Sequence, residues 1–363
     1  MDEQAILEDV FFVTFYGGGT MLNAVAALYL LLRRGNAIAP DVTSPVRLRR
    51  WAAAFLFASA LSHVMWLLYV CHPSFAAYAA VCGLDILIFI PTIAGILLAM
   101  LQDRYRPVWP VAVTLVPVIA LLVLSILRND DTLIVPLSIY VVSLFALLML
   151  YMFFAVRRYG RWLRDNYADL EHKEIWQSLL ILAVFLLFFV IYSRTTDDRL
   201  YLYLLQLDNV LIVIVLLWRV ETLQQLSDNA PALADPADDT QKASTPPVIP
   251  TNIGPLLKKF CEDGQLYLQH DLTLAQLAQA IGTNRYYLSQ HFAQQGLTYN
   301  AYINGLRIDH FIRLYHEAVS EQRFFTAQQL AYESGFHSYS TFSAAFKQKV
   351  GTTVTAWMRS AEE

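Results

Sequence analysis

The sequence predicts an all-α protein, in which a bundle of seven transmembrane helices is followed by a soluble helical domain. Three observations predict this fold. Only 15% of the residues are charged, whereas an ordinary soluble protein has about 25%. Apolar runs long enough to cross a membrane are confined to residues 1–220. After residue 254 the apolar residues follow helical spacing in shorter runs, and one pattern occurs twice.

Seven apolar stretches in residues 1–220 are predicted to span the bilayer, because its hydrocarbon core of about 30 Å requires roughly 20 residues of helix. The first stretch is not a secretory signal, because the chain begins with acidic residues and the apolar run is too long. Three glycines at 17–19 lie inside it without the lysine that a phosphate loop needs, and they predict close helix packing. The stretches run over approximately 11–32, 51–70, 75–101, 108–127, 132–156, 175–193 and 200–219.

Lysine and arginine predict the orientation of these spans, because cytoplasmic loops retain positive charge. The loops after the first, third and fifth stretches contain twelve basic residues, and the loops on the opposite side contain three. Tryptophan supports the same assignment, since amphipathic indole rings suit the headgroup layer. The N-terminus is therefore expected outside and the C-terminus in the cytoplasm. The tryptophans at the predicted inner ends are Trp51, Trp109, Trp176 and Trp218.

Polar residues inside the spans predict a ligand site, because an ionisable side chain in lipid is costly and by default indicates function. By helical rise, His63, Asp85 and Asp208 each lie roughly 10–15 Å below the outer surface, and Asn209 follows Asp208. These four residues are the candidate ligand-binding residues of an outward-facing pocket. The alternative is hydrogen bonding between helices, which requires no ligand. A retinal site is excluded, because the only lysine before residue 220, Lys173, lies in a loop.

Residues 221–254 are predicted to form a flexible linker between the transmembrane domain, residues 1–220, and the domain at residues 255–363. This segment contains five of the 14 prolines, and its acidic residues outnumber its single lysine five to one. Such a composition is typical of an extended tether. The linker alone accounts for the net charge of −4, because the parts on either side each contain equal numbers of acidic and basic residues.

Two copies of one pattern, 53 residues apart, occur in the last part of the chain. Residues 273–282 read TLAQLAQAIG, and residues 326–335 read TAQQLAYESG. Threonine is a favoured N-cap, and the final glycine permits a tight turn. Each copy is followed by two apolar residues four apart, on one face of a second helix. We therefore expect two helix-turn-helix units, joined by a helix over Tyr299–Tyr315. The two apolar pairs are Leu288 with Phe292, and Phe342 with Phe346.

In these segments the chain resembles the C-terminal DNA-binding domain of AraC-type transcription regulators, over about residues 255–358. The resemblance rests on LTLAQLAQAIGTNRYYLSQHF, YINGLRI, LAYESGFHSYSTFSAAFK and the glycine at 351. It implies seven helices, two of which enter successive major grooves of double-stranded DNA. Taken with the apolar stretches, it predicts a protein of the bacterial inner (cytoplasmic) membrane with its C-terminal domain in the cytoplasm. The chain departs from the family at Val354, where proline is usual, at Phe311, where alanine is usual, and at Gln290 and Ala344, where arginine is common.

The predicted DNA contacts lie on the second helix of each unit. Glutamine can read adenine in a bidentate manner, whereas alanine can only touch a thymine methyl group. Residues 255–363 contain nine basic and nine acidic residues, which predicts weak non-specific binding and a shallow dependence on salt. Base contacts are expected from Asn284, Arg285, Tyr286, Ser289, Gln290, Ser338, Tyr339, Ser340 and Ala344, and phosphate contacts from Lys347 and Lys349.

Together these features predict a membrane-bound one-component transcription regulator without a cofactor or a metal, since the histidines have no ligand spacing. An enzyme is not expected, because nucleophile-elbow, P-loop and zincin motifs are missing from the sequence. The expected partners are double-stranded DNA, the lipid bilayer and an unknown signal ligand. Two mechanisms remain open: formation of a homodimer, which raises the effective concentration of DNA-binding domains, and proteolytic release at the linker. The alternative function is a transporter-like membrane sensor whose C-terminal domain binds a protein.

Overall fold

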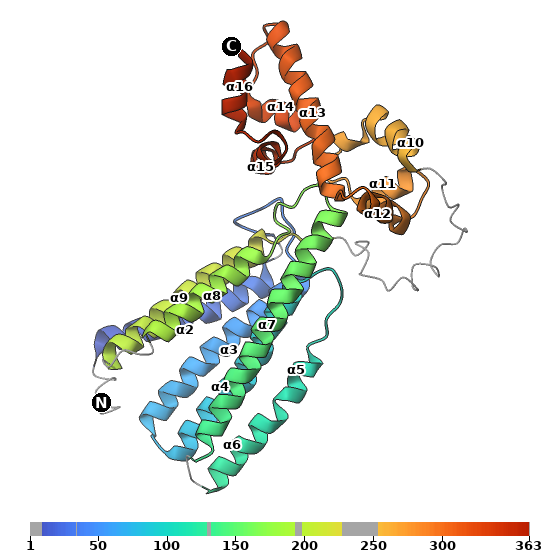
Figure 1. The fold of residues 1–363 in the computed structure, drawn as a ribbon. Coiled ribbons are helices and arrows are strands. Elements are labelled where there is room, and N and C mark those ends of the chain that lie inside the picture. The colour runs from blue at the N-terminus through green and yellow to red at the C-terminus, as the bar shows by residue number, and fades with distance from the viewer. Residues whose placement is uncertain (1–8, 34, 129–131, 193–197, 227–252, 363) are drawn as a thin grey trace. The chain divides into compact units, whose positions relative to one another are not determined.

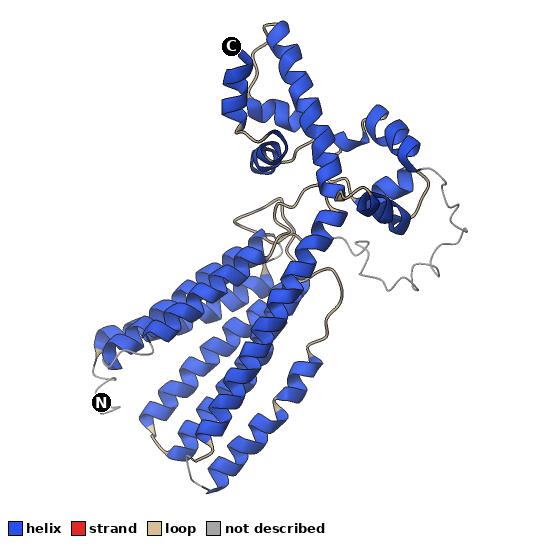
Figure 2. Cartoon of the chain, in the orientation of Figure 1, coloured by secondary structure: helices blue, strands red, loops and turns tan. Residues whose placement is uncertain are grey.

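The computed structural model describes residues 9–33, 35–128, 132–192, 198–226 and 253–362 (Figure 1). Throughout these ranges the regular structure is helical (Figure 2). One isolated antiparallel bridge pairs Tyr167 with Thr273. The prediction of an all-α chain is therefore confirmed. The chain divides into two compact units. Unit 1 consists of Met1–Arg157 and Ile175–Asp228, and unit 2 consists of Arg158–Glu174 and Asn229–Glu363.

Six helical segments of the described residues are long and apolar enough to cross a membrane. Short α5 and α6 count together as one of them, Trp109–Arg128, and the apolar part of α8, Trp176–Phe188, is shorter than the rest. The expected span at residues 175–193 thus corresponds to α8, a helix at the lower limit of length for crossing a membrane. The helices are α2 (Val10–Leu32), α3 (Val46–Cys71), α4 (Phe75–Met100), α5 (Trp109–Thr114), α6 (Val116–Arg128), α7 (Ile134–Asn166), α8 (Trp176–Tyr192) and α9 (Asp198–Thr222).

Local sequence explains where several of these helices begin. Asp9 caps α2, since its carboxylate accepts a hydrogen bond of 3.0 Å from the Phe12 N–H. Ser74 caps α4 in the same way, through a 3.1 Å hydrogen bond from the Ala77 N–H. The interruption between α5 and α6 follows from Pro117, which has no N–H to donate to the preceding turn.

The packed part of unit 1 extends beyond residue 220, where the linker was expected to begin. The Glu221 carboxylate accepts hydrogen bonds from the backbone N–H groups of Ala37 (3.0 Å) and Ile38 (2.7 Å). Gln102 binds the chain further on, donating to the Gln224 carbonyl and accepting from the Leu226 N–H, both at 2.9 Å. Paired polar groups therefore hold residues 221–226 in unit 1. At the other end of the expected linker, residues 253 and 254 begin the helix Ile253–Leu257. Residues 227–252 lie outside the described residues.

Unit 2 has seven α-helices in the described residues 253–362, as the resemblance implied. The first is continued by a π-helical turn over Lys258–Asp263, and a 3-10 turn follows at Leu266–Leu268. The helices are α10 (Ile253–Leu257), α11 (Leu274–Ala280), α12 (Arg285–Gln294), α13 (Tyr299–Ser320), α14 (Ala327–Glu333), α15 (Tyr339–Val350) and α16 (Val354–Glu362).

Two hydrophobic cores lie on either side of the long helix α13. Tyr299 and Ile303, at its beginning, belong to the first core, whereas Phe311 and Tyr315, further along, belong to the second. Helix α13 therefore contributes residues to the cores of both helix-turn-helix units. The apolar pairs named from the sequence are buried as expected: Leu277, Ala278, Leu288 and Phe292 in the first core, and Leu330, Ala331, Phe342 and Phe346 in the second.

Phe311 fills the second core, where the family usually has alanine. Its ring is fully buried, with its centroid 4.5 Å from that of Phe342 and 5.7 Å from that of Phe346. Val354, which replaces the usual proline, is buried in the same core at the start of α16. Both departures therefore add apolar volume to the second core.

Candidate nucleic-acid interface

Helix caps determine where the two candidate recognition helices, α12 and α15, begin. The Asn284 side chain accepts a hydrogen bond of 3.0 Å from the Tyr287 N–H, and Ser338 accepts one of 3.3 Å from the Thr341 N–H. Both residues were expected to contact bases. Their side-chain oxygens are N-caps in the structure, so their established role is to define the first turn of each helix.

The other expected base-contacting residues form an outward stripe on each helix. On α12, Tyr286 and Gln290 are exposed four residues apart, and Arg285 and Ser289 beside them are half-buried. On α15, the residues at 339, 340, 344 and 347 are all exposed. Because the apolar pairs of both helices point into the cores, these stripes are the surfaces that α12 and α15 can present to a groove.

Arg307 and Lys349, which are among the nine basic residues counted toward DNA binding, are bound to other groups of the domain. Arg307 is fully buried, and its guanidinium donates hydrogen bonds to the carbonyls of Tyr267 (2.8 Å) and Gln269 (2.6 Å). The ammonium group of Lys349, an expected phosphate contact, forms a salt bridge with the Asp309 carboxylate and donates to the Gly305 carbonyl. The positive charge available to phosphate is thus smaller than the sequence count.

The second helix-turn-helix has a turn that is one residue longer than the first, which the sequence repeat at offset 53 did not reveal. In the first unit the Thr283 N–H donates to the Ala278 carbonyl (2.9 Å), and in the second the Phe336 N–H donates to the Ala331 carbonyl (3.1 Å). The caps Asn284 and Ser338, however, are 54 residues apart. The extra residue is exposed His337, so α15 begins one residue later in its repeat than α12.

The polar residues inside unit 1 form contacts between helices. His63 Nε2 lies 3.2 Å from the Gln206 side-chain oxygen, which links α3 to α9. The Asn209 side-chain oxygen accepts hydrogen bonds from Asn23 (3.2 Å) and Ser59 (3.3 Å), which links α9 to α2 and α3. These contacts are those expected if the polar residues hold the helices together.

Close packing at this cluster explains one of the three glycines at 17–19. A Cβ atom at Gly19 would lie 3.1 Å from the Gln206 side-chain oxygen, whereas Gly17 and Gly18 have no such neighbour among the described residues. Asp85 accepts a hydrogen bond of 2.8 Å from the Trp66 indole N–H, which links α3 to α4. Three of the four candidate ligand residues, His63, Asp85 and Asn209, thus take part in contacts between helices.

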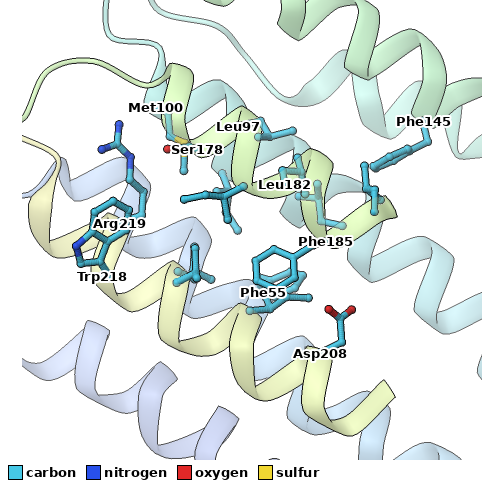
Figure 3. A pocket seen from close by; sticks show the side chains of 17 residues that line it. Phe55, Leu97, Met100, Phe145, Ser178, Leu182, Phe185, Asp208, Trp218 and Arg219 are labelled. Carbon is cyan, nitrogen blue, oxygen red and sulfur yellow. The ribbon is translucent and has the colours of Figure 1, made fainter. Parts of the chain in front are cut away.

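An apolar cavity of about 300 Å³ lies in unit 1 between α3, α4, α7, α8 and α9 (Figure 3). Asp208 is the only one of the four candidate ligand residues that lines it. Arg219 also lines the cavity from α9, eleven residues further along, which corresponds to about 16 Å of helix. The remaining labelled lining in Figure 3 is mostly aromatic and aliphatic: Phe55, Leu97, Met100, Phe145, Leu182, Phe185 and Trp218.

Comparison with known proteins addresses the C-terminal part. Residues 277–360 match the family model described as a helix-turn-helix domain, a range from α11 into α16 that includes both candidate recognition helices. No curated protein and no solved structure matches the chain. Two capped helix-turn-helix units, one shared helix and this family match agree with one another. The C-terminal part of the chain therefore contains a helix-turn-helix domain, and the match supports the AraC-type DNA-binding domain that the sequence resembles.

Proposed function

We propose that the protein is a membrane-bound one-component transcription regulator, in which a seven-helix membrane domain controls sequence-specific DNA binding by two helix-turn-helix units. The observation that carries this proposal is the pair of exposed stripes on α12 and α15, in a chain whose N-terminal part has helices of membrane-spanning length. Helices that serve only to pack the domain would not need polar outward faces on both α12 and α15.

Seven spans require that α8 crosses the bilayer. Its 17 residues extend about 26 Å at 1.5 Å per residue, close to the thickness of a hydrocarbon core. Its first residue, Trp176, suits the headgroup layer on the cytoplasmic side. With seven spans, the N-terminus lies outside and the DNA-binding domain lies in the cytoplasm, at the inner membrane of a bacterium.

Single cysteines introduced on either side of α8 test this topology. In a Cys71→Ser background, we expect a membrane-impermeant maleimide to label Thr196→Cys in intact cells and to label Arg104→Cys and His172→Cys only after lysis. Residue 196 lies outside the described residues, and its placement follows from the seven-span prediction. Labelling of Thr196→Cys only after lysis would mean that α8 does not cross.

DNA reading is tested with the full-length protein in lipid nanodiscs and a random duplex pool. We expect enrichment of a preferred sequence and a shallow dependence of affinity on salt, because the domain is formally neutral. Gln290→Ala should relax one adenine position by about 1–3 kcal/mol, and Lys347→Ala should weaken all sequences alike and reduce the salt slope by about one. Gln279→Ala, an exposed glutamine on α11, serves as the control.

Two outcomes would count against this reading of the domain. A salt slope of about eight or more would show that phosphate contacts dominate. Failure to enrich any sequence would favour the alternative, a helical domain that binds a protein partner.

Signal control is part of the same proposal. The cavity of unit 1 has the volume of a small ligand site, at the lower end of the usual range of roughly 300–1,000 Å³. A signal that brings two chains together would raise the effective concentration of DNA-binding domains. Proteolysis in the linker is the rival mechanism, and an immunoblot of induced cells separates the two, because proteolysis produces a soluble C-terminal fragment.

A further inference from the structure

The loop between α7 and α8, up to residue 174 (residues 167–174), belongs to the same unit as the helix-turn-helix domain in the structure. Unit 2 combines Arg158–Glu174 with the chain after residue 228. From these contacts, and resting on the proposed DNA-binding function, we infer that this α7–α8 loop is an internal competitor of DNA. It docks on the helix-turn-helix domain and masks the first turn of the second recognition helix, α15.

The backbone of the loop is embedded in the first helix-turn-helix unit. Ala168 is fully buried and forms part of the first hydrophobic core. The Asn300 side chain donates hydrogen bonds to the carbonyls of Ala168 (2.6 Å) and Tyr167 (3.2 Å), and Asn304 donates to the Ala168 carbonyl at 3.1 Å. Because the loop's carbonyls are paired with amides from α13, their burial carries little of the penalty of unsatisfied polar groups.

Main-chain pairing adds a second contact between the loop and the first helix-turn-helix unit. Tyr167 pairs with Thr273, the N-cap of α11, in the only β-bridge of the described residues. Tyr167 is itself buried, and burial raises the pKa of its hydroxyl to about 12. The Tyr167 side chain is therefore neutral in this contact.

Two carboxylates of the loop occupy the beginning of α15. The Thr341 hydroxyl donates a hydrogen bond of 3.2 Å to Asp169, which is buried, and the Ser340 hydroxyl donates one of 3.3 Å to Glu171. Asp169 also accepts from the Glu171 N–H at 3.0 Å, which holds the two acidic residues together. Both hydroxyls lie in the first turn of α15.

The first turn of a recognition helix is where DNA would bind. A helix N-terminus carries a partial positive charge and attracts phosphate groups, and Ser340 is one of the predicted base contacts. A hydroxyl that donates its proton to one of these carboxylates cannot donate it to DNA at the same time, and the carboxylates themselves repel phosphate. The loop engages only the hydroxyls of this turn: the residues at 339, 344 and 347 stay exposed, as do Tyr286 and Gln290 of the α12 stripe, so docking should weaken DNA binding without abolishing it.

The connectivity provides a route from the membrane to this contact. The loop follows directly on α7, which ends at Asn166, and precedes α8, which begins at Trp176. A change in the relative position of these two helices would therefore act on the loop and shift the balance between docked and free states. The apparent affinity for DNA would follow, because it falls in proportion to the fraction of competent chains.

The first experiment removes the carboxylates in full-length protein in nanodiscs and measures binding to the enriched DNA by fluorescence anisotropy. We expect Asp169→Ala with Glu171→Ala to tighten binding about five- to tenfold, because the loop loses two charged hydrogen-bond acceptors. The control removes the same charge from exposed positions of unit 2, with Asp263→Ala and Glu321→Ala. Equal tightening in both double variants would mean a general electrostatic effect and would overturn the masking.

The second experiment locks the contact with a disulfide. In Asp169→Cys with Thr341→Cys, oxidation should cross-link the chain internally and weaken DNA binding about tenfold, and reductant should restore it. Neither single variant should respond to oxidant. Absence of the cross-link would refute the docking, and a cross-linked chain that binds DNA normally would refute the masking. If no form of the protein binds DNA, the proposed function and the masking fail together, while the cross-link still reports whether the loop docks.

Discussion

Replacement of Arg307 by methionine is expected to destabilise the DNA-binding domain by about 3–5 kcal/mol, because several carbonyl groups inside the domain lose a charged hydrogen-bond donor. The guanidinium donates to the carbonyls of Tyr267, Gln269 and His270 at 2.8, 2.6 and 3.3 Å. Methionine has similar length but offers no donor. Each buried carbonyl left without a partner costs about 1–3 kcal/mol, and these losses need not add.

Arg307 also connects the two helix-turn-helix units. Its guanidinium carbon lies 5.6 Å from the centroid of the Phe336 ring, in the turn of the second unit, while its hydrogen bonds go to the segment that precedes the first. The methionine variant should therefore lose protection in both units together. Arg307→Lys should retain part of the stability, because a compact ammonium group cannot reproduce the planar fork.

Native-state hydrogen exchange of full-length protein measures this effect, through the opening free energies of peptides from α11 and α14. Arg313→Met is the matched control on the same helix. The Arg313 side chain is 54% exposed and its nitrogen lies 3.9 Å from the Glu317 carboxylate, so its loss should cost less than about 1 kcal/mol. Similar losses of stability for both variants would show that the buried hydrogen bonds of Arg307 stabilise the domain no more than the exposed ion pair of Arg313 does.

The burial of Arg307 could have been predicted from the sequence, although the count of charges did not indicate it. Residues 303, 307, 311 and 315 are spaced by four and lie on one face of α13, and three of them are Ile303, Phe311 and Tyr315. An arginine in the middle of an apolar face is expected to be buried and paired. The repeat, the caps and the apolar pairs were predictable because they depend on neighbours within about ten residues.

Contacts between distant segments were not predictable in this way. Asn300 meets Ala168 across 132 residues of chain, and no local pattern in either segment indicates the other. In the membrane part, hydropathy predicts which residues form spans but not how each helix is rotated. Asp208 and Asn209 are adjacent on α9, yet Asp208 lines the cavity while Asn209 binds Asn23 and Ser59. Consecutive helical residues point about 100° apart, which is enough to separate them.

Gly335→Ala is expected to destabilise the domain through backbone strain and through steric overlap together. Gly335 has a left-handed backbone (φ +95°), where an added Cβ costs about 1–2 kcal/mol. That Cβ would also lie 2.9 Å from the Leu268 Cα and 3.0 Å from the Tyr267 carbonyl oxygen. Both neighbours are backbone atoms of the turn at Leu266–Leu268, and the Tyr267 carbonyl of this turn accepts a hydrogen bond from Arg307. Relief of the clash must therefore move that turn.

The repeat supplies a control at the equivalent position of the first unit. Gly282 also has a left-handed backbone (φ +73°), but the described residues place no atom within 4 Å of its added Cβ. Gly282→Ala should therefore cost only the backbone strain, and Gly335→Ala about 1–3 kcal/mol more, as overpacking does. Hydrogen exchange and thermal unfolding of both variants measure the difference. Equal losses would mean that the turn at Leu266–Leu268 yields without cost, and that the two helix-turn-helix units are not held together there.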